Sequence, residues 1–273
     1  MFTLGCDRAY LYGHPERELT ADEQSRYEEA LGLRSKGIPA QYITGHQEFW
    51  GMDLIVSPAV LIPRPETEHV IEVVLGLIAS AENRTGETPV PPQTNSIVER
   101  RASPPGHPCH VVDVGTGSGC IALALAKELP EAEIHATDIS PAALEIAEAN
   151  AARHQMTSRV QFHDTDLLKS LPRGYFDFVV SNPPYVGESE EDSVQLEVRK
   201  FEPRSAVFAG STGLEVIERL IPQAREALKP GGWLVMEISG TIAERVRGLL
   251  CAWDNVEITK DLQGISRIVS AQT

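Results

Sequence analysis

The chain has few positive charges and no long apolar run. Its 273 residues include 24 Lys and Arg against 39 Asp and Glu, which gives a formal charge of −15. Nonspecific binding of nucleic acid relies on Lys and Arg that neutralise phosphates, so this balance argues against it without excluding a local basic patch. The longest strongly apolar stretch, 120–126, is far shorter than the roughly 20 residues that span a bilayer. We therefore expect no direct nucleic-acid partner and no membrane attachment.

Cysteine and histidine also lack the spacings that indicate metal sites. The four cysteines, at positions 6, 109, 120 and 251, form no C-x-x-C pair, and the eight histidines form no H-E-x-x-H pattern. We expect no metal and no disulfide framework, with the thiols reduced. The first ten residues contain no charged segment followed by an apolar one, so we expect no signal peptide and a cytoplasmic protein.

From residue 110 onward, segments typical of strands and helices alternate. The predicted strands are 111–114, 133–137, 160–162, 176–181, 233–238 and two more near 256 and 268, and the predicted helices are 120–129, 141–153, 214–228 and 242–252. Ser140 and Pro141 fit the N-cap and first helical positions of the second helix. The alternation predicts an α/β protein with a mostly parallel sheet covered by helices on both faces.

The part before residue 110 is less regular. Thr20 and Glu23 have the spacing of a capping box, which predicts a helix that begins after Thr20. Aromatic and β-branched residues around Gly51 predict a hairpin within 47–62, and the prolines of 63–65 favour a helix over 66–79. Residues 82–108 hold six of the 19 prolines, so we predict a flexible insertion, with an interdomain linker as the alternative.

A glycine-rich segment lies between the first predicted strand of the alternating region and its helix. It reads Asp113-Val114-Gly115-Thr116-Gly117-Ser118-Gly119, and Asp138 ends the next strand, 21 residues after Gly117. A tight turn is the purely structural interpretation. The combination with a strand-terminal acid favours a nucleoside cofactor whose ribose hydroxyls that carboxylate would bind. The dinucleotide fingerprint G-x-G-x-x-G does not match, because Cys120 occupies its sixth position.

The D-x-G-x-G-x-G pattern instead resembles motif I of the class I S-adenosylmethionine (SAM) methyltransferases. The resemblance implies SAM as cofactor and a Rossmann-like, seven-stranded, mostly parallel sheet. It also implies that residues 115–119 (Gly115, Thr116, Gly117, Ser118 and Gly119) cradle the methionine part. In the same family Asp138 would bind the ribose, and Asp166 and Leu167 would flank the adenine. For Asp166 a helix N-cap is the equally open alternative.

A second motif, Asn182-Pro183-Pro184-Tyr185, follows the strand 176–181, at the sheet edge where open α/β proteins bind ligands. An amide nitrogen is a poor nucleophile because its lone pair is delocalised. The side-chain oxygen of Asn182 and the carbonyl of Pro183 can accept hydrogen bonds from its two N–H groups and so position it, while Tyr185 can pack on a planar target. The alternative interpretation is a proline-rich turn after a strand, with no functional role. The motif predicts N-methylation of an amide, of adenine N6 or of guanine N2.

Further motifs make the chain closely similar to one family, the release-factor glutamine N5-methyltransferases. They are 39–45 (PAQYITG), 48–51 (EFWG), 61–68 (LIPRPETE), the two motifs above, 201–203 (FEP) and 210–214. The resemblance implies that the chain methylates the glutamine amide in the Gly-Gly-Gln loop of class 1 peptide-chain release factors. Such a protein partner suits an acidic chain better than DNA does. A ribosomal-protein glutamine methyltransferase is the nearest alternative, and a nucleic-acid methyltransferase a more distant one.

The resemblance also suggests a division of the chain. We expect a partial N-terminal helical substrate-recognition domain over 1–40, apparently lacking its first helices, and a connecting β-hairpin over 41–62. A helix over 63–81 leads into the catalytic part, followed by the insertion 82–108 and the methyltransferase domain 109–273. A misassigned start codon would explain the short N-terminal domain, and weakened docking of the partner is the other interpretation. Arg64 is assigned to the substrate or cofactor carboxylate or to a lid, with a salt bridge to Glu66 or Glu68 as the alternative.

Overall fold

The computed structural model describes residues 2–84 and 108–273. The prediction of a flexible insertion falls almost wholly on residues outside these ranges and stays a prediction. The helices of the described ranges are α1 (Arg8–Gly13), α2 (Ala21–Ser35), α3 (Ala40–Thr44), the short 3-10 helix η1 (Pro65–Thr67), α4 (Glu68–Arg84), α5 (Cys120–Glu128), α6 (Pro141–Arg153), the 3-10 helix η2 (Glu188–Ser193), α7 (Leu196–Phe201), α8 (Arg204–Val207), α9 (Glu215–Ala227) and α10 (Ala243–Leu249). The strands are β1 (His46–Phe49), β2 (Met52–Ile55), β3 (His110–Val114), β4 (Glu133–Asp138), β5 (Val160–Asp164), β6 (Phe176–Ser181), β7 (Leu228–Glu237), β8 (Asp254–Lys260) and β9 (Ser266–Gln272).

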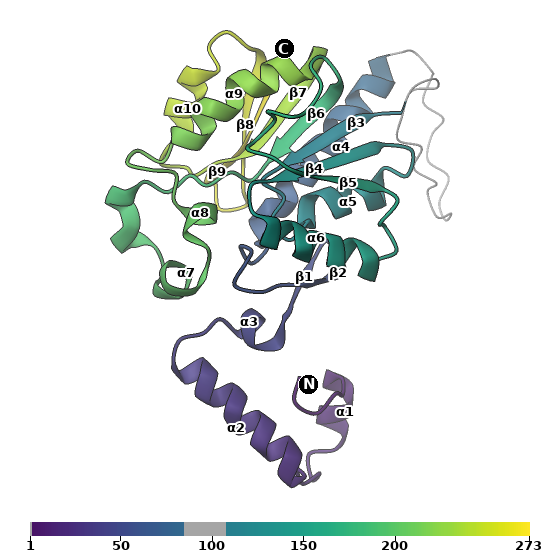
Figure 1. Ribbon diagram of the computed structural model, residues 1–273, viewed down its shortest axis with the longest axis vertical. Helices are drawn as coiled ribbons and strands as arrows, with labels where there is room; N and C mark the ends of the chain where they lie inside the picture. The colour runs from purple at the N-terminus through teal and green to yellow at the C-terminus, as the bar shows by residue number, and fades with distance from the viewer. Residues whose placement is uncertain (1, 85–107) are drawn as a thin grey trace.

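The central sheet has the strand order β5-β4-β3-β6-β7-β9-β8 (Figure 1). The pairs from β5 to β7 are parallel, and β9 runs antiparallel to both of its neighbours. The chain builds outward from β3 to β5 and then returns to place β6 on the other side of β3. The strand order therefore reverses between β3 and β6, and ligands of open α/β sheets bind at the carboxyl ends of the strands at such a point.

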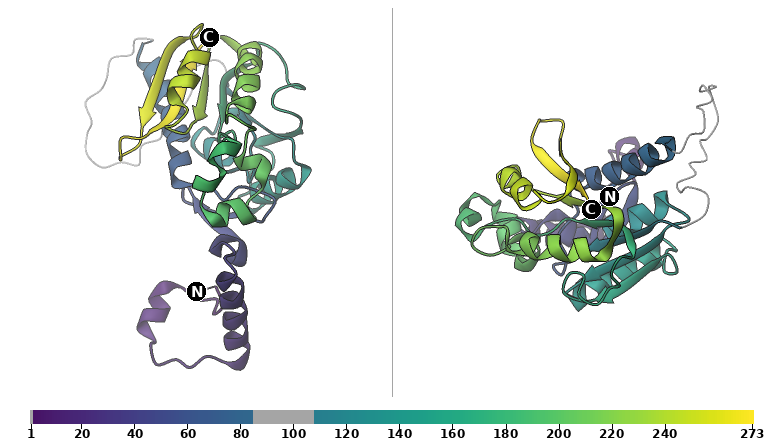
Figure 2. Two further views of the ribbon diagram at one scale, coloured as in Figure 1. Left: turned by 90° about the vertical axis from the view of Figure 1, so that its left-hand side faces the viewer. Right: turned by 90° about the horizontal axis from the view of Figure 1, so that it is seen from above.

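Helices cover both faces of this sheet, as the alternating pattern predicts (Figure 2). On one face α4, α5 and the β1–β2 hairpin share a core with alternate residues of the strands, such as Val111 and Ile134. On the other face α9 and α10 pack against the intervening residues, such as Val112 and Val179. Both faces of the central strands are thus buried, which explains why their sequences are almost continuously apolar.

The N-terminal helices extend away from the sheet, and α2 is their longest member (Figure 1). Its predicted capping box is confirmed, because Thr20 Oγ1 accepts from Glu23 N at 3.3 Å and Glu23 Oε2 accepts from Thr20 N at 2.9 Å. The hairpin predicted around Gly51 is present as the antiparallel pair β1–β2. An ion pair between Arg34 on α2 and Glu197 on α7, 2.5 Å apart, links the N-terminal helices to the sheet domain.

Some predicted boundaries are wrong. The helix predicted over 214–228 ends at Ala227, where the backbone turns extended, and β7 already begins at Leu228, which pairs with Phe176. A bulge between Phe176 and Phe178 accommodates Pro230-Gly231-Gly232 within the strand. These three residues form an irregular start of β7, which therefore begins before the strand predicted over 233–238. In the described ranges, no helix combines the length and apolar character needed to traverse a bilayer.

Candidate active site

The glycine-rich segment forms a loop between β3 and α5. Gly115, Gly117 and Gly119 have φ angles of +73°, +56° and +82°, which side-chain-bearing residues rarely adopt. A Cβ on Gly115 or Gly117 would meet no atom of the described residues within 4 Å, so the loop backbone there is open to a ligand. A Cβ on Gly119 would lie 3.2 Å from Ala147 Cβ. The third glycine therefore serves close packing against α6, and the first two leave room for a ligand.

Asp113, near the end of β3, stabilises the glycine loop through hydrogen bonds. Its Oδ2 accepts hydrogen bonds from Thr116 Oγ1 at 2.6 Å and from Ala122 N at 3.2 Å. The side chain is fully buried, and this burial raises the pKa of Asp113 to about 7. Within the described residues, Asp113 Oδ1, Ser118 Oγ and Thr137 Oγ1 are buried oxygens without a hydrogen-bond partner. Ser118 and Thr137 belong to residues that line the cleft, and their hydroxyl oxygens point into the buried side of the loop.

Asp138 lies at the end of β4, where the spacing from Gly117 predicts it. One carboxylate oxygen accepts from Gly117 N and the other from Ser140 N, each at 2.9 Å. Ser140 in turn caps α6 by accepting from Ala143 N, as predicted. Burial raises the pKa of Asp138, and its backbone hydrogen bonds oppose the rise. The carboxylate therefore ties the glycine loop to the start of α6 and keeps lone pairs for a ligand.

Asp166 and Leu167 lie on the same cleft, in a turn after β5. The alternative of a helix N-cap is wrong for Asp166, since no helix follows it. Its Oδ2 accepts from Lys169 Nζ at 2.6 Å and from the Arg219 guanidinium, and these hydrogen bonds lower the pKa of Asp166. Arg219, on α9, also lines the cleft and was not anticipated, because nothing near residue 219 in the sequence marks it.

The Asn-Pro-Pro-Tyr segment leaves β6 beside the glycine loop. Asn182 and Pro184 line the cleft. Pro183 is buried. Tyr185 is partly buried and packs against the core cluster that includes α9 and β7, and its hydroxyl donates to Glu237 Oε1 at 3.2 Å. Burial is the main cause that raises the pKa of Tyr185. The structure thus brings the asparagine, and not the tyrosine ring, to the cleft wall.

A buried pair that sequence reasoning did not single out supports Asn182. The Nδ2 of Asn182 donates to Thr67 Oγ1 at 3.0 Å, and Thr67 Oγ1 donates to Glu237 Oε2 at 2.6 Å. Thr67 and Glu237 are each only 2% exposed. The sequence does contain one indication of this pair, because Glu237 ends an otherwise apolar strand. A charge buried at such a place is costly unless it has a hydrogen-bond partner.

Arg64 lies on the cleft, but its partner differs from the predicted alternatives. It pairs with Glu202, and not with Glu66 or Glu68. The other oxygen of Glu202 accepts from Ile62 N at 3.2 Å. The pair therefore fastens the segment before η1 to the Phe-Glu-Pro segment after α7.

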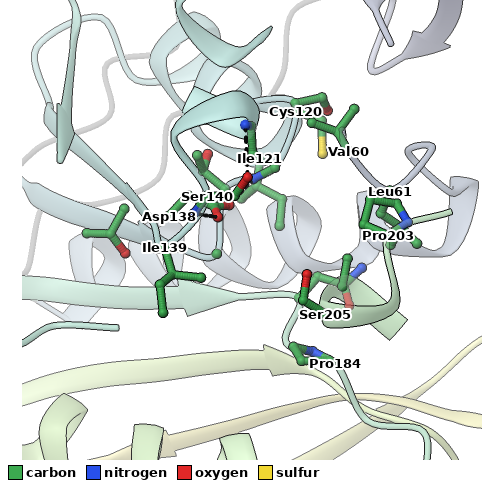
Figure 3. A pocket seen from close by; sticks show the side chains of 18 of the residues that line it. Val60, Leu61, Cys120, Ile121, Asp138, Ile139, Ser140, Pro184, Pro203 and Ser205 are labelled. Carbon is green, nitrogen blue, oxygen red and sulfur yellow. Dashed lines mark hydrogen bonds between the residues drawn. The ribbon is translucent and has the colours of Figure 1, made fainter. Parts of the chain in front are cut away.

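The cleft joins these groups at the carboxyl ends of the strands (Figure 3). Figure 3 shows Asp138 and Ser140 at the end of β4, Cys120 and Ile121 at the start of α5, and Pro184, Pro203 and Ser205 around the same space. Of the predicted cofactor residues, Gly119 alone is outside the lining. The open backbone at Gly115 and Gly117 and the Asp138 carboxylate beside it fit the methionine and ribose parts of SAM. The arrangement is that of the class I SAM-dependent methyltransferases.

Comparison with known proteins agrees with this class and narrows it. Residues 97–200 match the model of the methyltransferase small domain, and residues 1–45 match that of the PrmC N-terminal domain. A release factor glutamine methyltransferase of Koribacter versatilis is 54% identical over 98% of this chain and 87% of its own. One of Geobacter sulfurreducens is 38% identical over 98% and 85%. The chain belongs to the release factor glutamine methyltransferase family.

Solved structures extend the likeness to the fold. The catalytic domain of human METTL16, in complex with an RNA hairpin of the MAT2A 3′UTR, has a TM-score of 0.60 and 17% sequence identity. The match covers 98% of this chain and 93% of that chain. At this identity the likeness concerns the fold alone.

Proposed function

We propose that this protein transfers a methyl group from SAM to the side-chain amide N5 of the glutamine in the Gly-Gly-Gln loop of class 1 release factors. The observation that carries the proposal is the orientation of Asn182. Its Nδ2 is engaged by Thr67, so its Oδ1 is the end left for the cleft. An acceptor at that place suits an amide N–H donor. The relatives named release factor glutamine methyltransferases support the choice of substrate.

Residues of the glycine loop would hold the cofactor, with Asp138 on the ribose and Asp166 and Leu167 near the adenine. SAM supplies an electrophilic methyl group on a sulfonium. The amide nitrogen is a weak nucleophile even toward this methyl group, so the contribution of the protein is to position the nitrogen. Arg64 is held by Glu202 at the cleft, where its charge is available to a carboxylate of cofactor or substrate.

At the amide, Asn182 Oδ1 and the Pro183 carbonyl accept the two N–H hydrogens of the target. These two hydrogen bonds direct one face of the amide nitrogen toward the methyl donor and prevent the amide group of the target glutamine from rotating. The chain needs no strong base before bond formation, because an alkylated amide nitrogen loses its proton readily. Pro184 restricts the ψ angle of the buried Pro183, and this limits the directions that the Pro183 carbonyl can take.

The test is to incubate the protein with methyl-labelled SAM and, separately, with a class 1 release factor, a ribosomal protein substrate and DNA. We expect label only on the release-factor glutamine, located by mass spectrometry of the Gly-Gly-Gln peptide. Label on the ribosomal protein or on DNA, with none on the release factor, would overturn the proposed substrate.

The Asn182→Ala variant tests the amide clamp in the same assay. Loss of one precisely placed hydrogen-bonding group at a reacting centre costs about 10²–10³ in turnover, and we expect a loss at least that large. Binding of SAM, followed by calorimetry, should change little, because the residues assigned to ribose and adenine are untouched. Undiminished turnover would contradict the role given to Asn182.

A further inference from the structure

Three polar residues form a hydrogen-bonded chain from the cleft into the core. Asn182 and Thr67 both line the cleft, Thr67 from η1 and almost fully buried, and Glu237 ends β7. Their successive contacts are 3.0 Å and 2.6 Å, and Tyr185 donates to the other oxygen of Glu237 at 3.2 Å. They come from segments more than 50 residues apart in the sequence, so the fold alone assembles them.

The direction of these hydrogen bonds depends on the charge of the last member. An ionised carboxylate only accepts, and a hydroxyl has a single hydrogen to donate. Thr67 must therefore direct its hydrogen to Glu237 and can only accept from Asn182. The NH2 end of the Asn182 amide must then face Thr67, and its oxygen must face the cleft.

We propose that Glu237 is a positioning residue whose negative charge, relayed by the Thr67 hydroxyl, fixes the orientation of the Asn182 amide that methyl transfer requires. The proposal rests on the proposed function, since it assigns Oδ1 to an N–H donor of the substrate. If Glu237 were neutral, it could donate to Thr67. The Thr67 hydrogen would then be free for Asn182 Oδ1, and the amide could turn its NH2 end to the cleft, where it would repel the N–H groups of the target.

The surroundings of Glu237 shift the pKa of its carboxyl group in opposite directions. Burial is the main influence and raises its pKa, while hydrogen bonds from Thr67 and Tyr185 and the positive charge of Arg267 on β9 act against the rise. Glu66 on η1 adds a smaller upward influence, and the charge of Glu237 in turn contributes slightly to the raised pKa of the Cys120 thiol at the start of α5. The charged form is therefore lost at a higher pH than for an exposed glutamate.

The decisive comparison is the turnover number of the wild type against Glu237→Gln across pH. A neutral acceptor orients a hydroxyl less strongly than a charged one by about 1–1.5 kcal/mol, so we expect kcat to fall about tenfold near pH 8, with KM for the release factor little changed. As pH is lowered, Glu237 is protonated and the wild type should approach the variant, so that the ratio of the two kcat values falls toward one. Other titrating groups are shared by both proteins and cancel in the ratio. A ratio that is constant with pH, or equal to one throughout, would overturn the proposal.

Two substitutions at Thr67 separate relay from packing. Thr67→Ser keeps the hydroxyl and should stay within about twofold of wild type, whereas Thr67→Val keeps the shape and should lose about tenfold or more in kcat. Equal losses in the two variants would show that Thr67 only fills space. Thermal unfolding of each variant shows whether it is folded.

A measurement without substrate keeps this inference separate from the choice of substrate. In a 15N–1H correlation spectrum, the side-chain NH2 of Asn182 should exchange slowly in the wild type and faster in Thr67→Val and Glu237→Gln, since only the wild type holds it firmly. Equal exchange in all three would contradict the relay, even if another protein or a nucleic acid proved to be the methyl acceptor.

Discussion

Replacing Glu202 by glutamine should destabilise the protein more than replacing Glu197, although each residue forms one ion pair with an arginine. Glu202 is buried, with 2% of its side chain exposed, and it binds both the Arg64 guanidinium and Ile62 N. The Glu197 pair with Arg34 lies 5 residues earlier on α7 and is exposed, at 42% and 46% of the two side chains. The two variants therefore differ chiefly in burial and in the extra backbone hydrogen bond.

The size of the effect follows from these contacts. A glutamine at 202 keeps one acceptor oxygen but turns its NH2 group toward either Arg64 or Ile62 N, where a donor meets a donor. Loss of a hydrogen bond to a charged group costs about 1.5–3 kcal/mol. Arg64 is 34% exposed and is partly solvated by water, so we expect the lower part of this range, about 1.5–2 kcal/mol. The exposed pair of Glu197 contributes about 0–1 kcal/mol.

Urea unfolding followed by circular dichroism measures both free energies of unfolding. In thermal scans the expected losses correspond to about 4–6 °C for Glu202→Gln and no more than about 3 °C for Glu197→Gln. The two variants have the same change in charge, so a general charge effect cancels between them. Equal destabilisation by both, or a larger loss from Glu197→Gln, would refute the reasoning that burial and the Ile62 contact decide the outcome.

Three further predictions concern the glycine loop and the residues that support it. Asp138→Ala should weaken SAM binding by about tenfold to 100-fold in calorimetry, because it removes a charged acceptor and the tie to the loop; unchanged affinity would refute the ribose assignment. The pKa of Asp113, raised by burial to about 7, lies above that of an unfolded chain, so its stabilising contribution is complete at acidic pH and is lost as pH rises through about 7. Urea unfolding between about pH 5 and 8 should therefore show a steeper loss for the wild type than for Asp113→Asn, and parallel curves would contradict this. Gly119→Ala should cost about 1–2 kcal/mol, because φ is +82° and the Cβ would approach Ala147 closely, whereas Gly32→Ala in α2 should be neutral or stabilising; a stable Gly119→Ala would show that the loop can shift.

The features predictable from sequence are those whose partners are near in the chain. Thr20 and Glu23 are three residues apart, and Ser140 caps a helix that starts at its neighbour, so the signals are local and the structure confirms them. The spacing between Gly117 and Asp138 also predicted that this carboxylate lies beside the glycine loop, because a strand–loop–helix–strand unit has a fixed geometry.

The features that sequence missed involve partners chosen by tertiary packing. Arg64 has two glutamates within four residues, yet it pairs with Glu202, which lies 138 residues away. Thr67 and Glu237 are 170 residues apart. No local pattern ranks such partners, since their encounter depends on how η1 and the segment after α7 pack at the sheet edge. The aromatic ring of Tyr185 likewise has the chemistry to face a substrate, but it packs against the core instead, and no local pattern predicts that packing.

The attachment of α2 has a mechanical consequence. Its 15 residues form a rod about 22 Å long, joined to the sheet domain at one end by a short turn around Gly37 and the exposed pair of Arg34 with Glu197. A rod held at one end amplifies small rotations, so a tilt of about 10° at that turn moves the far end by about 4 Å. The exposed ion pair contributes about 0–1 kcal/mol to holding the attached end, beside the contacts of α2 with α3. A small rotation at Gly37 therefore displaces the far end of α2 much more than the end attached to the sheet domain.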